Sequence, residues 1–198
     1  GAWLFQELNT ALFFALIALR SAFGVTSPTT VRATPTHLVE QQPVIVQTIA
    51  PDAVLIDFGR VAFGNLRLTL PDGAHGSITV HFGEAQSEGR INRKPPGTVR
   101  YAVVPATLEG APLIVAPPPD KRNAIAPLVP TPAEWGVLLP FRWIEIEGWP
   151  GELRPERVRR RAAFARTWDD QAAAFASSDE MLNQIWELCH YSIKATTF

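Results

Sequence analysis

Hydrophobic and polar residues alternate along several short stretches between residues 43 and 168. In 66–70 leucine alternates with arginine and threonine, and in 76–85 Ile78, Val80 and Phe82 share one side of the chain. A period of two residues is typical of a half-buried strand. The pattern therefore predicts strands at the following ranges: 43–49, 54–70, 76–85, 99–106, 136–150 and 158–168.

Turn-forming residues separate these strands. The chain holds 18 prolines and 13 glycines, and Pro71-Asp72-Gly73 combines the fixed φ of proline with the positive φ open to glycine. Short strands between such turns, with no helices among them, predict a mainly β protein built as a β-sandwich. On the strand 141–147, the alternation places Phe141 on the same face as Trp143 and Glu145.

The last residues change to a helical period. Ser177 and Glu180 have the spacing of a capping box, which predicts a helix start. One face of this helix is predicted to be apolar and consists of Leu182, Ile185, Trp186, Cys189 and Ile193. Exposure of such a face would forfeit about 1.5–3 kcal/mol for each large side chain. We expect it either to dock on the sandwich or to pack against partners beyond Phe198.

The pattern divides the chain into four parts. Residues 44–168 are the predicted sandwich, in which 109–134 form a proline-rich excursion, and 175–198 are the C-terminal helix. Residues 25–43 are rich in serine, threonine and proline and are predicted to be a linker. Residues 1–24 contain an apolar run of signal-peptide length, so they are either an incomplete signal peptide of an exported protein or a short helix. The run is too short to span a membrane.

Charge and motifs restrict the classes of function. A formal net charge of −1 gives no electrostatic support for nucleic-acid binding, and the basic run 157–166 is interpreted as a solvated strand face or an interface with acidic residues. The sequence has no glycine-rich phosphate loop, so no cofactor is expected. The four histidines are widely spaced and Cys189 is the single cysteine. We therefore expect no metal site, and Cys189 is interpreted as a small core residue.

Two groups of side chains are candidates for carbohydrate chemistry. Glu145 and Glu147 are two carboxylates on one strand face, as a glycosidase needs, although such neighbours more often face solvent or pair with arginine. Trp135, Trp143 and Trp149 could stack on sugar rings, although strand aromatics more often belong to a core. We retain the three tryptophans as candidate carbohydrate contacts and assign no catalytic residue.

The order of several motifs resembles one enzyme family. Asp57-Phe58-Gly59 opens a strand, Gly83-Glu84-Ala85 ends another, and Phe141-Arg142-Trp143 lies in a third. A Ser-Asp-x-x-Leu-Asn-x-x-Trp helix follows at 178–186. This order is similar to that of the bacterial α-L-rhamnosidases of glycoside hydrolase family 78, over residues 44–198. The resemblance implies a jelly-roll or concanavalin-like β-sandwich, followed by the first helix of an (α/α)6 catalytic barrel.

The resemblance also implies what the chain does. The family's catalytic carboxylates follow that first helix, so the chain is expected to be an inactive, C-terminally truncated piece of an inverting α-L-rhamnosidase, which releases terminal rhamnose from glycosides. The barrel would pack on the helix at 179–194, and the whole protein would bind a rhamnose-containing carbohydrate. A stand-alone carbohydrate-binding or structural β-sandwich is the alternative that the residues leave open.

Overall fold

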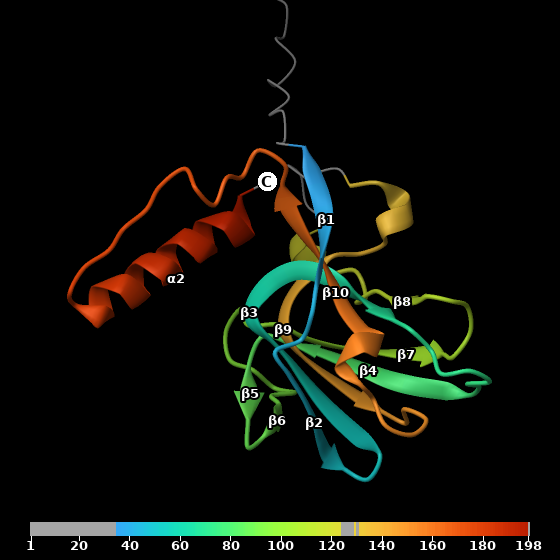
Figure 1. Ribbon diagram of the computed structural model, residues 1–198. Coiled ribbons are helices and arrows are strands. Elements are labelled where there is room, and N and C mark those ends of the chain that lie inside the picture. Colours follow the sequence, from blue (N-terminus) through green and yellow to red (C-terminus); the bar gives the residue numbers. More distant parts are fainter. Residues whose placement is uncertain (1–34, 124–128, 130, 198) are drawn as a thin grey trace, which may run out of the picture. The chain divides into compact units, whose positions relative to one another are not determined.

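The described part of the chain is a β-rich body with one helix beside it (Figure 1). The computed structural model describes residues 35–123, 129 and 131–197, all within the second of two compact units, 1–32 and 33–198. The expectations for residues 1–24 therefore lie outside the described residues. The elements in chain order are β1 (Thr36–Gln41), β2 (Ile45–Ala50), β3 (Ala53–Leu68), β4 (Ser77–Gly83), β5 (Gln86–Ser87), β6 (Arg90–Ile91), β7 (Tyr101–Thr107), β8 (Leu113–Val115), the 3-10 turns η1 (Lys121–Asn123) and η2 (Ala133–Trp135), β9 (Leu139–Glu147), η3 (Pro155–Arg157), β10 (Val158–Ala165) and α2 (Glu180–Thr196).

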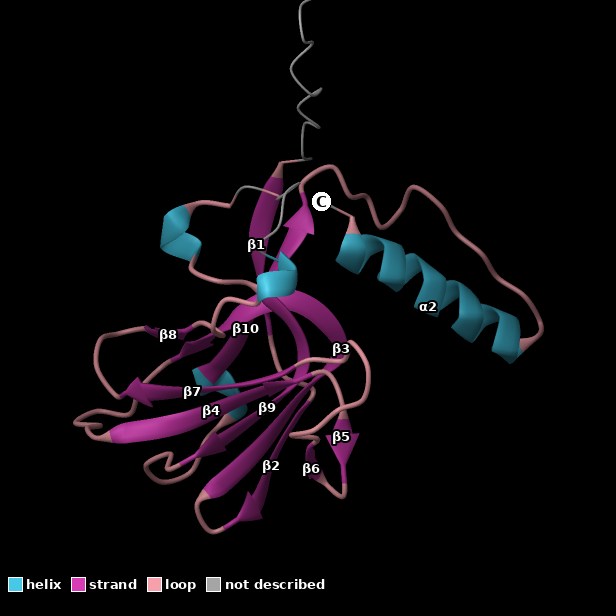
Figure 2. Cartoon of the chain, turned by 180° about the vertical axis from the view of Figure 1, so that it is seen from behind, coloured by secondary structure: helices cyan, strands magenta, loops and turns pink. Residues whose placement is uncertain are grey.

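The strands form two antiparallel layers joined by two long strands (Figure 2). One layer has the order β2, the first half of β3, the second half of β9, β4 and β7. In the other layer β1 pairs with β10, and β10 pairs with the second half of β3, which β8 also joins. The predicted mainly β fold, a β-sandwich with one C-terminal helix, is thus confirmed, and its strand pairs are antiparallel.

The strands β3 and β9 bend from one layer to the other. Their pairing shifts between Asp57 and Ala62, because β3 contains extra residues there, and Gly59 takes a φ of 79° that favours glycine. The bend turns the Phe141 side chain into the core together with Ile144 and Ile146. The predicted sharing of a face by Phe141 and Trp143 was therefore wrong, because strict alternation does not survive a bend.

The core lies between the two layers and draws on both. Its buried members are Val54, Ile56, Phe58, Leu66, Leu68, Ile78, Val80, Phe82, Leu108, Val115, Phe141, Ile144, Ile146, Trp149, Leu153 and Val158. Phe141 has no exposed surface and meets the rings of Phe58 and Phe82 edge-on, at centroid distances of 6.0 and 5.2 Å. The predicted inward side of the strand 76–85 (Ile78, Val80 and Phe82) is in this core.

The first strand begins earlier than the sequence pattern indicates. β1 pairs with β10 along its whole length, from Thr36 opposite Ala165 to Gln41 opposite Arg160. This strand lies within the range 25–43 that was predicted to be a linker. It was missed because its six residues are only partly buried and carry no clear alternation; its order comes from pairing with a distant strand.

The helix α2 begins two residues later than the capping-box prediction implies, since its N-cap is Asp179 and not Ser177. Asp179 is the N-cap, and its carboxylate accepts a hydrogen bond from the Met181 N–H. Ser177 instead exchanges two hydrogen bonds with the Asn183 amide, both 2.9 Å long. These contacts fix the approach of the chain to the helix.

Candidate functional site

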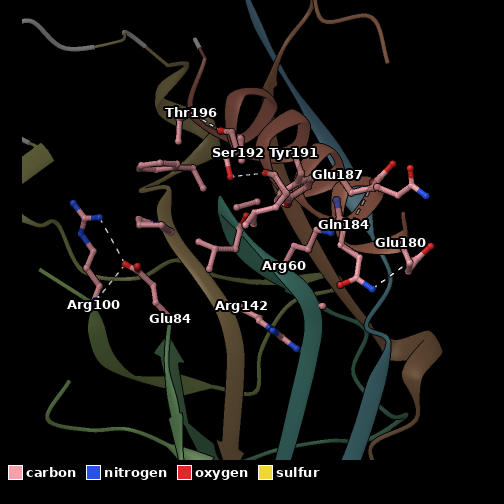
Figure 3. Close-up of a pocket in the computed structure, with 18 residues that line it drawn as sticks. Arg60, Glu84, Arg100, Arg142, Glu180, Gln184, Glu187, Tyr191, Ser192 and Thr196 are labelled. Atoms are coloured by element: carbon pink, nitrogen blue, oxygen red, sulfur yellow. Dashed lines mark hydrogen bonds and ion pairs between the residues drawn. The ribbon is translucent and has the colours of Figure 1, made fainter. Parts of the chain in front are cut away.

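A cleft of about 910 Å³ lies between the bend of β3 and β9 and the helix α2 (Figure 3). One wall is the sheet, from which Arg60 and Arg142 reach the cleft. The other wall is α2, from which Glu180, Gln184 and Glu187 face it. Its volume is within the range of about 300–1,000 Å³ common for small-molecule sites, which makes it the candidate site of the described residues.

The sheet wall is held by a buried aspartate. Asp57 is 2% exposed and accepts hydrogen bonds from the Gly59 N–H and from Nε and Nη2 of Arg142, each 2.7 Å long. Burial by itself would raise the pKa of Asp57, but the bonds from Arg142 and Gly59 outweigh it and hold that pKa below its ordinary value. The carboxylate is therefore ionised at neutral pH and fixes the Arg142 guanidinium at the edge of the cleft.

The helix wall meets the sheet through polar groups. The Tyr191 hydroxyl donates a 2.9 Å hydrogen bond to the carbonyl oxygen of Val61. The Arg60 guanidinium lies 4.8 Å from the centre of the Tyr191 ring and 3.4 Å from a carboxylate oxygen of Glu187. Ala195 is buried at the same contact. The face of α2 that docks is therefore its polar and small-residue face.

The apolar face of α2 points away from the sandwich. Leu182, Ile185 and Ile193 are about half exposed, at 45%, 49% and 55%, and Cys189 is exposed. Of the two placements expected for this face, docking on the sandwich was therefore wrong. The interpretation of Cys189 as a core residue is also not what the described chain shows. Both expectations failed because the side chains of α2 that contact the bend of β3 are hydrogen-bonding ones.

A buried arginine lies behind the cleft. Arg160 is 1% exposed and donates hydrogen bonds to the Gln41 side-chain oxygen and to the carbonyl oxygens of Arg60 and Phe141, over 2.6–2.8 Å. Its guanidinium also lies 4.9 Å from the centre of the Phe58 ring. Burial lowers the pKa of Arg160 to about 10, so the group stays charged at neutral pH. It ties β10 to β1, β3 and β9.

One end of the cleft is closed by a second group of charges. The Arg100 N–H donates to a carboxylate oxygen of Glu84 over 3.2 Å, and the Arg100 guanidinium meets Asp120 at 3.1 Å. Burial raises the pKa of Glu84 in spite of the nearby arginine. Hydrogen bonds from Arg122 hold the pKa of Asp120 well below its usual range. These pairs anchor the loop after β8 to the sheet.

The carboxylates Glu145 and Glu147 belong to a separate cluster on the outer face of the sheet. Glu145 is fully buried and accepts hydrogen bonds from Arg90 and from Arg93, the latter at 3.0 Å. Glu147 accepts from Arg93 at 2.6 Å and lies 3.5 Å from Nε2 of His81. Pairing with arginine, which the sequence analysis gave as one of the more common roles of such carboxylates, is therefore what the structure shows. The cluster fastens the β5–β6 hairpin over the sheet.

This hairpin packs closely. The Ile91 side chain is buried against Gly83, where an added Cβ would lie 2.5 Å from its Cγ2 atom. Position 83 therefore requires glycine, because Ile91 lies too close for any side chain there.

The same cluster has the ligand atoms of a metal site, but its carboxylates are already neutralised by arginines. Ligand atoms of His81, Glu145 and Glu147 lie within 4.8 Å of one another. The guanidinium groups of Arg90 and Arg93 already bind both carboxylates, and their charges oppose a divalent cation. The arrangement fits an ion-pair network that holds the hairpin better than a metal centre.

Acidification is expected to destabilise the sandwich through this cluster. Burial and the charge of Arg93 lower the pKa of His81, so its protonation favours the unfolded chain. The hydrogen bond from Arg93 lowers the pKa of Glu147. Stability should therefore be full above about pH 6.5, fall as His81 takes up a proton below that value, and fall again below about pH 4.5 as Glu147 is protonated.

Urea unfolding at a series of pH values measures this effect. His81→Gln should flatten the dependence between pH 7.5 and 5.5, and His75→Gln, at an exposed position, should leave it unchanged. Equal pH slopes in His81→Gln and the wild type would contradict the assignment.

The three candidate tryptophans lie in different settings. Trp149 is 7% exposed and belongs to the core. Trp143 is half-buried, with the Arg142 guanidinium 4.6 Å from the centre of its ring. Trp135 lies in η2, where its carbonyl oxygen accepts a 2.6 Å hydrogen bond from Asn65. None of them is among the residues that line the cleft, and their contact with carbohydrate stays a prediction.

Sequence reasoning did not predict the cleft, although some of its lining residues stand in the motifs named above: Gly59, Glu84, Arg142 and Asn183. Arg160 has the same parity as Val158, Ala162 and Phe164 on β10, all of them buried, so alternation along 158–164 was a signal for its burial. Arg60, Gln184 and Tyr191 carried no such signal, because they meet only through the docking of α2 on β3.

Within the described residues, no helix combines the length and the apolar character that crossing a membrane requires.

The family model that matches the chain and the solved structures named below are all of α-L-rhamnosidases. Residues 47–110 match the sequence model of the bacterial α-L-rhamnosidase concanavalin-like domain. No curated protein sequence matches the chain significantly. Among solved structures, the chain is similar to the α-L-rhamnosidase from Dictyoglumus thermophilum (TM-score 0.61, 17% identity, 84% of this chain and 17% of that one) and to the native enzyme from Aspergillus terreus (0.61, 18%, 83% and 17%). The Streptomyces avermitilis α-L-rhamnosidase, solved with L-rhamnose, also matches (0.58, 17%, 84% and 14%).

The two-layered antiparallel fold and these matches define a concanavalin-like β-sandwich. Within the chain, residues 47–110 are similar to the bacterial α-L-rhamnosidase concanavalin-like domain. The chain spans only 14–17% of the length of these three solved structures.

Proposed function

We propose that the chain is a non-catalytic part of an inverting α-L-rhamnosidase, whose whole protein releases terminal rhamnose from glycosides. The observation that carries the proposal is the match of residues 47–110 to the concanavalin-like domain of that family. The domain fold itself does not set a substrate, because sandwiches of this kind serve many functions. The sugar comes from the family.

The apolar face of α2 supports a structural role for the chain. The face is presented on a helix whose polar side is fixed to the sandwich by Tyr191, Arg60 and Ala195. Its leucine and isoleucines are about half exposed, so each would gain about 0.7–1.5 kcal/mol if fully buried. In the proposed whole protein, the helices of the catalytic barrel cover this face. The sandwich then supports the barrel from its side.

Hydrolysis of an aryl α-L-rhamnoside tests the proposal. The 198-residue chain alone should be inactive, whereas the full-length gene product should hydrolyse the substrate. In the full-length protein, Ile185→Glu should lower the yield of active enzyme at least about tenfold, because a buried unpaired carboxylate costs several kcal/mol.

Val103→Glu is the matched control, since Val103 is 44% exposed on β7 and contacts neither the cleft nor α2. Hydrolysis by the chain alone, or a full-length protein with no activity on the rhamnoside, would refute the proposal. Equal yields for Ile185→Glu and Val103→Glu would refute the packing of the barrel on this face.

A further inference from the structure

The cleft between the sheet and α2 is lined by hydrogen-bonding side chains around an apolar floor. The floor consists of Val61, Ala62 and Pro140 from the sheet, and Leu188 adds exposed apolar surface on the helix wall. Above it stand planar guanidinium, carboxylate and amide groups from both walls (Figure 3). A ligand that fits has both an apolar face and several hydrogen-bonding groups at its edge.

The charges that line the cleft cancel. Arg60 faces Glu187, Arg100 faces Glu84, and Arg142 faces Asp57. Each guanidinium therefore already has a carboxylate partner, and the lining residues together carry three arginines and three glutamates. This balance favours a neutral ligand.

Several polar atoms in the cleft remain open for such a ligand. Within the described residues, Nη1 of Arg142 and Oε1 of Gln184 have no hydrogen-bonding partner, while the other polar atoms of these groups are engaged at Asp57 and Glu180. The open donor thus lies on the sheet wall and the open acceptor on the helix wall. Hydroxyl groups, which both donate and accept, satisfy the two together.

We propose that this cleft binds a neutral saccharide, whose apolar ring face lies on the floor and whose hydroxyl groups bond to Arg142 and Gln184. The site lies on the docking side of α2, opposite the apolar face that the proposed barrel covers. Binding of a saccharide there does not depend on the rhamnosidase activity proposed above.

Saturation-transfer NMR on the 198-residue chain tests the site with three probes: L-rhamnose, D-glucose and the charged D-glucuronate. At least one neutral sugar should bind, and glucuronate should bind more weakly. Gln184→Ala should reduce the affinity for the neutral sugar about five- to tenfold, the effect of losing one hydrogen bond. Gln86→Ala, on the exposed β5, is the matched control and should leave it unchanged.

A blocking variant gives a second readout. Ser192 is exposed and lines the cleft, so Ser192→Trp should fill it and abolish binding, whereas Leu182→Trp on the opposite face of the same helix should not. Thermal melts followed by circular dichroism show that each variant is folded. Absence of binding, preferential binding of glucuronate, or binding that survives Gln184→Ala and Ser192→Trp but is lost in Trp143→Ala would overturn the proposal.

Discussion

Replacing Arg160 with alanine is expected to lower the free energy of unfolding by about 3–5 kcal/mol. The change leaves three acceptors without their donor: the buried carbonyl oxygen of Phe141, and the partly buried Gln41 side-chain oxygen and Arg60 carbonyl oxygen. Each unsatisfied buried acceptor costs about 1–3 kcal/mol, partly recovered where water enters. The lost guanidinium also leaves a cavity beside the Phe58 ring.

Urea unfolding followed by tryptophan fluorescence measures the loss, and the neighbouring residue provides the control. Arg161 is half-buried on the opposite side of β10, and Arg161→Ala should change stability by no more than about 0.5 kcal/mol. Arg160→Lys should fall in between, because a single ammonium cannot span three acceptors in different directions. Arg160→Ala and Arg161→Ala with the same unfolding midpoint would show that the buried guanidinium does not hold the strands together.

Replacing Phe141 with alanine is expected to cost a similar amount, about 3–5 kcal/mol, for a different reason. Phe141 has no exposed surface, and its ring meets Phe58 and Phe82 edge-on at the bend where both layers share the core. Removing it deletes apolar contacts to both layers at once. The cavity that remains can close only if the bend of β9 moves.

The control for Phe141 is a phenylalanine outside the core. Phe175 is 45% exposed and stacks on Trp186, so Phe175→Ala should cost less than about 1 kcal/mol. Phe141→Leu, which keeps most of the volume, should lose less than half of what Phe141→Ala loses. A loss for Phe141→Ala no larger than that for Phe175→Ala would mean that the two layers do not share one packed core.

The success of sequence reasoning depended on whether a residue's surroundings were local. The strand 76–85 could be predicted with the correct inward face, because β4 is straight and Ile78, Val80 and Phe82 keep a period of two. Phe141 was placed on the wrong face because the bend at Gly59 interrupts that period, and a single strand does not reveal its partner's extra residues. The local sequence pattern therefore predicted where the strands lie but not where they bend.

The helix shows the same limit for the candidate site. Helical spacing identified the apolar face of α2 correctly, since Leu182, Ile185 and Ile193 do lie together. Hydrophobicity alone suggested that this face was the one available to dock, yet the contacts with β3 use Tyr191 and Glu187. Which face docks depends on the groups opposite it, and those come from residues about 130 positions earlier in the chain. The cleft could not have been predicted without that contact.

The position of β10 between β1 and β3 has a consequence for biosynthesis. β10 is synthesised after the other described strands, yet among these strands it is the only one that pairs with β1, with Ala165 opposite Thr36. Until it emerges, β1 and the second half of β3 present open edges, which in nascent chains recruit neighbouring strands. Pairing between such distant segments is also slow to form. The sandwich can therefore complete its fold only after β10 has been synthesised, because β1 has no strand partner before that point.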